Sequence, residues 1–248
     1  MATRTSKYDK KKSKYIKQLY DETEEQLEEV YKVHKDNKKK LEEKVGLILL
    51  TYTIVKTLVT MSSKDQAKEQ KEFDKLLKSM YLAVGTASII ATDKILEDQT
   101  KKMYEFLGVT RSKQDIRKFV KKAFNNETYS KRIWKNEDKV KAALKGEFTK
   151  FLKGETNVNN IKNKFAKVFK AQRYNIDRLV DTELTRVINM ALLDSYEEQG
   201  VTHVRWCSVL EEGTCADCRD LDGTVFKIED AHGLIPAHPN CKCYWERV

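Results

Sequence analysis

The sequence predicts a mainly helical protein that ends in a small β-hairpin stapled by a metal ion. Only two prolines, both after residue 235, and nine glycines interrupt the 248 residues, so helices are free to run through most of the chain. Apolar residues recur at intervals close to 3.6 over the first 200 residues, which is the period of an amphipathic helix. Four of the five cysteines come after residue 214, in two close pairs. A chain of this length can bury a real core, as one large domain or two small ones.

The N-terminal region begins with a basic segment. Before Ile16 the cations far outnumber the single acid Asp9, which predicts an arm that is disordered at its start. A long amphipathic helix is expected from Ile16 to Tyr52, because its bulky positions keep the helical period. His34 falls on this bulky stripe, where a packed core histidine is expected more often than a ligand.

The segment Val45–Met61 is the most apolar run in the chain. It is shorter than the roughly 20 apolar residues of a membrane span and it contains Lys56, so we expect a buried helix. Ser63 and Gln66 fit a capping box that starts a second helix, which folds back on the first and ends near Gly108. Residues 1–109 therefore form a long N-terminal helical hairpin with its basic arm.

Residues 110–200 are expected to be a basic helical region. Ser112 and Asp115 form a capping signature, Asn125-Asn126 marks a turn, and a helix from 129 to 153 is closed by Gly154. Two further helices follow, one starting after Asn157 and one from about Asn175 to Gln199, which Gly200 closes.

The positive charge is concentrated in this middle region. Residues 111–173 carry a net charge of +13, whereas residues 174–248 carry −7. In the helix after Asn157, Ile161, Phe165, Val168 and Gln172 are expected to face inward, and five cations face outward: Lys162, Lys164, Lys167, Lys170 and Arg173. A solvated surface explains such a face, and so does non-specific, salt-sensitive contact with DNA phosphates.

The C-terminal cysteines have the spacing of a zinc site. Cys215 and Cys218 form one chelating pair, and Cys241 and Cys243 form a second, with His238 close by. Zinc prefers thiolate and imidazole donors in a tetrahedron, and two short pairs separated by a loop supply them. The four cysteines are the preferred set, with His238 competing for the fourth position. Between the pairs, Asp222-Gly223 can turn a hairpin and Thr224-Val225-Phe226 can form a short strand.

Cysteines at this spacing also occur as redox pairs and in disulfides. A redox pair needs a lowered thiol pKa, but Asp217 and Asp220 would raise the pKa of their neighbours. Disulfides need an oxidising compartment, and the first residues show no apolar signal segment, so a reducing compartment is expected. Cys207 lies outside both pairs and is expected to be an ordinary part-buried thiol.

Several segments from residue 110 onward resemble the phage head morphogenesis family, the minor head proteins related to phage Mu protein F. The specific part is Thr214-Cys-Ala-Asp-Cys218, Leu221-Asp-Gly223, Phe226 and Pro236-Ala-His-Pro-Asn-Cys-Lys-Cys243. Weaker matches are Tyr129–Trp134, Arg178–Leu184, Asn189 and Tyr196–Val201. The chain has Asp181-Thr182-Glu183 where the family tends to have Arg-Thr-Glu, and Cys-Lys-Cys where it tends to have Cys-Arg-Cys.

The resemblance implies a head morphogenesis domain in two parts, residues 110–200 and 201–248. It also implies a structural protein of a tailed phage that acts in head assembly and in genome packaging or delivery. Its expected location is inside the head and, during assembly, in the bacterial cytoplasm. Its expected partners are the portal protein, other capsid or scaffold proteins and double-stranded DNA, without a membrane.

An enzyme is the rival class. Zinc knuckles also brace nucleases of the His-Asn-His type, and His232, His238 and Asn240 lie near the cysteines. Four cysteines would close the zinc shell, and the residues after Cys243 are too few for the helix that a second metal would need. We therefore expect a protein that is not an enzyme.

Overall fold

The computed structural model describes residues 7–208 and 214–248 and is mainly helical, as predicted. The chain divides into two compact units, each made from separate segments of the sequence. Residues 27–91 and 130–176 form what we call the helical unit. Residues 1–26, 92–129 and 177–248 form the mixed unit. Two long helices, α3 (Ser63–Phe106) and α6 (Val158–Glu198), contribute to both units.

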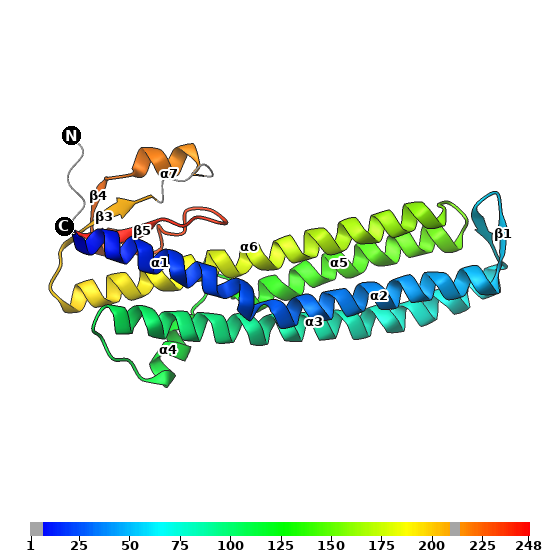
Figure 1. The fold of residues 1–248 in the computed structure, drawn as a ribbon, viewed down its shortest axis with the longest axis horizontal. Helices are drawn as coiled ribbons and strands as arrows, with labels where there is room; N and C mark the ends of the chain where they lie inside the picture. Colours follow the sequence, from blue (N-terminus) through cyan, green and yellow to red (C-terminus); the bar gives the residue numbers. More distant parts are fainter. Residues whose placement is uncertain (1–6, 209–213) are drawn as a thin grey trace. The chain divides into compact units, whose positions relative to one another are not determined.

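The helical unit is a bundle of α2 (Glu28–Thr51), most of α5 (Tyr129–Leu152) and the first parts of α3 and α6 (Figure 1). All four helices contribute to one apolar core, in which the Phe73 and Phe148 rings stack with centroids 3.6 Å apart. The core residues are Leu41, Val45, Ile48, Val59, Phe73, Leu77, Met80, Leu144, Phe148, Phe151, Leu152, Ile161, Phe165 and Phe169.

The predicted N-terminal hairpin is formed by α2 and α3. Lys44 pairs with Glu69 at 2.6 Å, whereas Asn37, two turns earlier in α2, reaches the carbonyl of Met80 later in α3. Contacts that run in opposite directions along the two helices require an antiparallel arrangement. His34 is buried, as expected for a packed histidine, and it belongs to neither group of possible metal donors found among the described residues.

The prediction of a buried helix over 45–61 was wrong. Helix α2 ends at Thr51, and a two-stranded hairpin follows, with β1 (Thr53–Val55) antiparallel to β2 (Leu58–Thr60). The β-branched residues after Tyr52 favour strands, and Lys56 and Thr57 turn the chain with positive φ angles of 47° and 72°. Within the described residues, no helix is long and apolar enough to cross a membrane.

The start of the chain also differs from the expectation. Residues 1–6 of the predicted arm lie outside the described residues, and α1 (Lys7–Gln26) is already helical from Lys7. The predicted helix over 16–52 is divided at Leu27. Leu27 keeps a backbone conformation in the helical region (φ −87°, ψ −6°), so the period of the apolar residues continues across the division. The second helix is capped by Ser62, which bonds Asp65, one residue before the expected Ser63.

The middle helices follow the sequence signals with one exception. Ser112 caps α4 (Lys113–Val120) by accepting from the Asp115 N–H at 3.1 Å, as expected. Gly154 and Gly200 follow α5 and α6 with positive φ angles of 70° and 74°. The separate helix expected from Asn175 was wrong, because α6 is continuous and no glycine or proline separates its two halves.

The mixed unit contains a three-stranded antiparallel sheet in the order β4-β3-β5. Its strands are β3 (His203–Cys207), β4 (Val225–Lys227) and β5 (Tyr244–Arg247). Trp206 and Trp245 are register partners, and their rings meet edge to face with centroids 5.4 Å apart. Strand β4 confirms the predicted Thr-Val-Phe strand, but Asp222-Gly223 follows α7 (Ala216–Leu221) instead of turning a tight hairpin. A four-residue helix, α8 (Ile228–Ala231), follows β4.

One lysine of the predicted arm is part of the core of the mixed unit. Lys12 on α1 is fully buried and donates a hydrogen bond to the Tyr196 hydroxyl at 3.1 Å. Its ammonium also lies 5.7 Å from the ring centroids of Tyr196 and Tyr244. The hydroxyl and the two ring faces compensate in part for the lost hydration of the ammonium. Helix α1 is therefore fixed to α6 and β5 instead of lying free.

Candidate metal centre

The first chelating pair is built on the start of α7. Cys215 is the N-cap of this helix, and its sulfur accepts from the Cys218 N–H at 3.4 Å. The guanidinium of Arg219 donates to the Thr214 carbonyl at 2.7 and 2.9 Å, and these bonds hold the residue before the N-cap against α7. A cysteine at the cap and another on the first turn point to the same side, so the spacing fixes both thiols toward one point.

The second group of donors comes from the turn before β5. The Cys241 N–H donates to the His238 carbonyl at 3.1 Å, and Asn240 takes a positive φ of 63° inside this turn. Asparagine adopts this conformation more readily than most residues, which permits the tight return of the chain. Cys241 and Cys243 are two residues apart in extended chain, so their side chains lie on the same face.

These segments place five donor atoms together. The Nε2 atom of His238 lies 3.1 Å from Cys215 Sγ and 3.2 Å from Cys218 Sγ, and Cys218 Sγ lies 4.0 Å from Cys241 Sγ. Two groups, Cys215-Cys218-His238 and Cys218-Cys241-Cys243, each have donor atoms within 4.8 Å of one another. A zinc tetrahedron with ordinary bond lengths separates its donors by about 3.5–3.8 Å. The cluster could therefore hold one metal ion.

His238 has the tautomer that a ligand needs. Its Nδ1 lies 2.9 Å from the Pro239 carbonyl, which can only accept, so Nδ1 carries the hydrogen. In the neutral ring Nε2 then has a free lone pair, and this is the atom that faces Cys215 and Cys218. A backbone carbonyl that fixes the imidazole in this way is common around metal-binding histidines.

Cys243 is in a different situation. The Ser208 hydroxyl donates its hydrogen to the Cys218 carbonyl, so at the contact between Cys243 Sγ and Ser208 Oγ, 3.6 Å long, the thiol is the donor. A hydrogen bond to Cys241, together with burial, raises the pKa of Cys243, while the same hydrogen bond lowers the pKa of Cys241.

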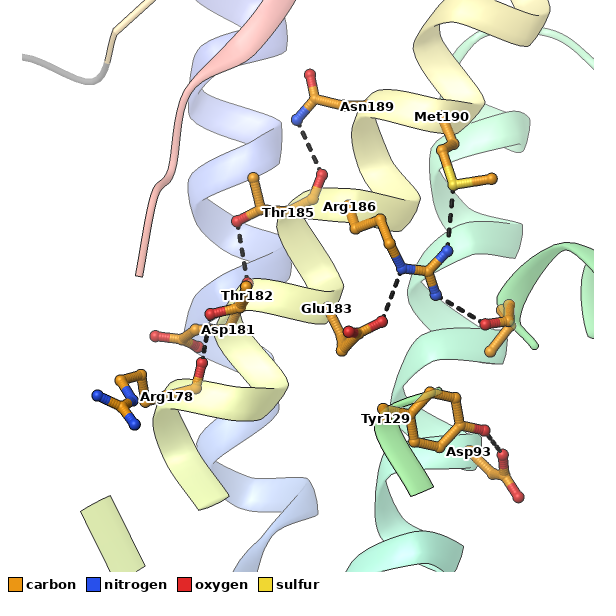
Figure 2. Close-up of polar contacts among 11 residues, drawn as sticks. Asp93, Tyr129, Arg178, Asp181, Thr182, Glu183, Thr185, Arg186, Asn189 and Met190 are labelled. Atoms are coloured by element: carbon orange, nitrogen blue, oxygen red, sulfur yellow. Dashed lines mark hydrogen bonds and ion pairs between the residues drawn. The ribbon is translucent and has the colours of Figure 1, made fainter. Parts of the chain in front are cut away.

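One face of α6 holds the second donor segment by its backbone. Thr182 accepts from the Asn240 N–H at 3.1 Å, and Thr185 donates to the Cys241 carbonyl. Asn189 donates to the Cys243 carbonyl at 2.9 Å and accepts from the Trp245 N–H at 3.0 Å. The three residues follow one another along α6 (Figure 2), at the i, i+3, i+7 spacing of a helix face. The donor segment is therefore shaped by the helix as well as by its own turn.

The adjoining face of α6 carries a buried ion pair. Arg186 and Glu183 approach to 2.7 Å with their side chains 3% and 1% exposed. Arg186 also donates to the Val120 carbonyl at 2.7 Å and contacts Met190 Sδ at 3.1 Å (Figure 2).

The expected DNA-binding cations all lie on the first half of α6, in the helical unit. Lys162, Lys164, Lys167, Lys170 and Arg173 are exposed, while Ile161 and Phe165 are buried on the other side of the helix. Arg173 differs from the lysines because its guanidinium lies 3.9 Å from the Tyr31 ring centroid. No acidic residue occurs in α6 before Asp177, so these charges are not neutralised within the half-helix.

A comparison with protein families matches part of the chain. Residues 145–246, less than half of the chain, match the family model described as Phage Mu protein F like protein. No curated protein and no solved structure matches the chain significantly. The matched segment contains the end of α5, all of α6, the sheet and the five metal-donor candidates. Over this segment the similarity to the phage Mu F-like head proteins, which the cysteine block indicated, is confirmed.

Proposed function

We propose that the protein is a minor head protein of a tailed bacteriophage, acting in head assembly and located in the virion. The observation that carries this proposal is the coincidence of the matched segment with the metal-donor cluster and the helix that supports it. A closed cluster of sulfur and nitrogen donors serves a structural role, because it leaves no coordination position for a substrate. The same chemistry supports a protein that is not an enzyme.

We further propose that the metal is zinc and that Cys215, Cys218, Cys241 and His238 bind it. These four donors are linked by the three short contacts in the cluster, and His238 presents a free lone pair. Cys243, which the sequence favoured for the fourth position, is then a neighbouring thiol held by Ser208. A bound zinc would replace the short donor contacts with four bonds and fix α7 to the turn before β5.

Elemental analysis of protein purified without chelator tests the zinc and its ligands. We expect about one zinc per chain, lost in Cys215→Ser and His238→Ala and retained in Cys243→Ser. Cys207→Ser is the matched control, because Cys207 is a part-buried thiol outside the cluster. Absence of stoichiometric metal from the wild type would contradict the site. Loss in Cys243→Ser with retention in His238→Ala would restore the four-cysteine set.

DNA contact is proposed for the first half of α6. Four lysines and Arg173 are held on one rigid helix, and the buried face of that helix prevents them from turning inward. Each phosphate that a cation neutralises contributes about −0.9 to the slope of log affinity against log salt on duplex DNA. Such contact is independent of base sequence, because only phosphates are bound.

A salt titration of duplex binding tests this contact. Replacing Lys162, Lys164, Lys167, Lys170 and Arg173 with glutamine is expected to shallow the slope by up to about 4.5. The matched control replaces five exposed lysines that each pair with a glutamate: Lys32, Lys38, Lys39, Lys75 and Lys101. The control changes net charge equally but removes no proposed contact. Equal slopes in the two variants would mean that the α6 cations are only solvated.

The portal is the proposed partner, and this part of the proposal rests on the resemblance alone. The test is an affinity purification of the tagged protein from procapsids that have been isolated from infected cells and gently dissociated. We expect the portal protein to be recovered with it, together with much less major capsid protein than the intact shell contains. Recovery of major capsid protein without portal would contradict portal association but leave a place in the head.

A further inference from the structure

The core of the helical unit contains a layer of polar side chains beside its apolar cluster. His34 and Asn37 come from α2, Glu137 from α5 and Gln172 from α6, and each is at most 6% exposed. Burying polar groups at this density is unfavourable unless their hydrogen bonds are satisfied. The layer therefore raises the question of which partners its donors and acceptors have.

Only part of this layer is satisfied by the protein. Gln172 donates through Nε2 to Glu137 Oε2 at 2.6 Å, and Asn37 donates to the Met80 carbonyl at a long 3.5 Å. The second oxygens, Glu137 Oε1 and Gln172 Oε1, are buried without a hydrogen-bond partner among the described residues. Each such group destabilises the fold relative to one whose hydrogen bond is satisfied.

A small cavity is lined by both Glu137 and Gln172. Its volume is about 10 Å³, and its walls include Asn37, Tyr81, Glu137, Lys141, Phe169 and Gln172. That is close to the smallest space that holds one water molecule. The nearby cation does not fill the role of donor, because the Lys141 ammonium lies over the Tyr81 ring, 5.0 Å from its centroid.

We propose that this cavity is a binding site for a single internal water molecule that donates its two hydrogens to Glu137 Oε1 and Gln172 Oε1. The Asn37 amide lines the same cavity and has a second N–H to offer to the water oxygen. Three partners is the usual number for a buried water. The site is independent of the metal centre and of DNA, since it uses none of their residues.

The water gives the Glu137 carboxyl a partner in either protonation state. Burial raises the pKa of Glu137 to about 7, so near neutral pH the group exists in both forms. A fixed side-chain donor would suit only the carboxylate, whereas a water molecule can rotate and accept from the protonated acid. Besides Glu137, the polar residues that line the cavity are Asn37 on α2, Tyr81 on α3, Lys141 on α5 and Gln172 on α6. The charge of the neighbouring Asp138 also raises the pKa of Glu137.

A crystal structure of the full chain tests the proposal directly. We expect one density peak within hydrogen-bond distance of Glu137 Oε1 and Gln172 Oε1, retained in Glu137→Gln and absent from the Glu137→Met/Gln172→Met double variant. A dry cavity, with the acid and amide rearranged into a direct two-bond pair, would overturn it. So would an anomalous peak at the site after soaking in thallium, which would show a monovalent cation instead.

Solution NMR supplies a second measurement that does not depend on crystals. We expect a nuclear Overhauser effect from long-lived water to the Gln172 side-chain amide. The Gln70 amide is the matched control, because it donates to Asp74 while its oxygen accepts from Thr149. No effect at Gln172, or an equal effect at Gln70, would contradict a bound water.

Discussion

The two halves of α6 show how one continuous helix takes two roles. Before Asp177 the helix buries Ile161, Phe165 and Phe169 and exposes a row of cations, in the helical unit. From Leu179 to Leu193 most residues are buried, and three of the polar ones, Thr182, Thr185 and Asn189, bond the backbone around the metal donors. A buried polar residue in this half marks a contact within the fold, whereas an exposed cation in the first half marks a surface available to a ligand.

The largest expected effect comes from removing the proposed metal. Structural zinc contributes apparent free energies on the order of 10 kcal/mol in small zinc domains, so chelation should unfold the knuckle around α7 and β5. Trp206 and Trp245 lie in this sheet, and their fluorescence should change. Helical circular dichroism should fall little, because the basic half of α6 is in the other unit. An unchanged tryptophan signal after complete metal removal would contradict a structural metal.

The buried ion pair gives the next largest effect. Arg186→Met leaves the Glu183 carboxylate buried without its partner at 2.7 Å, which should cost about 3–5 kcal/mol of unfolding free energy. Urea denaturation followed by tryptophan fluorescence measures it. The control is Lys164→Met in the exposed half, expected within about 0.5 kcal/mol of the wild type. Similar losses of unfolding free energy in both variants would mean that the two halves of α6 do not differ in how much a charged side chain contributes to stability.

The pH dependence of the stability of the helical unit tests the groups that are buried beneath the first half of α6. Burial lowers the pKa of His34 to about 4, and Arg173 adds to this, so its contribution to stability is lost as pH falls from about 6.5 to 4. Burial raises the pKa of Glu137 to about 7, so its contribution is lost as pH rises from about 4.5 to 7. Each effect is worth about 3 kcal/mol at most, and the two oppose each other between pH 4.5 and 6.5.

Single variants should separate these opposed effects. We expect the wild type to change little in stability between pH 4.5 and 6.5. Glu137→Gln should become more stable as pH rises through this window, and His34→Gln should become less stable. Thermal unfolding of the bundle across this range measures both. Parallel curves for the two variants would contradict the assignment.

The smallest effect concerns the support of the donor segment. Asn189→Ala removes the acceptor and the donor that hold Trp245 and Cys243, which should cost about 1–3 kcal/mol and weaken metal affinity. The control is Asn163→Ala, an exposed asparagine in the basic half, which should be close to neutral. Competition with a zinc indicator measures the affinity. Equal affinities would show that the turn orders its donors without α6.

The helical class, the helix ends at Gly108, Gly154 and Gly200, and the gathering of candidate donors in the last 34 residues could be predicted from the sequence alone. These are local properties, because a glycine that takes a positive φ or a short pair of thiols acts on its immediate neighbours. The β-hairpin at Lys56-Thr57 was missed because an apolar run of that length fits a helix or a pair of strands equally well. The domain boundaries drawn at residues 109 and 200 remain a prediction.

The residues that the long helices bring together could not be predicted from the sequence and are seen only in the folded chain. Thr182, Thr185 and Asn189 meet residues more than fifty positions away, and Lys12 meets Tyr196 across most of the chain. Each is a polar residue that could face solvent or make a buried contact. The helical period shows which face of the helix the residue occupies, but not what covers that face. The physical reason is that the free energy of a buried hydrogen bond depends on its distant partner, which only the folded chain supplies.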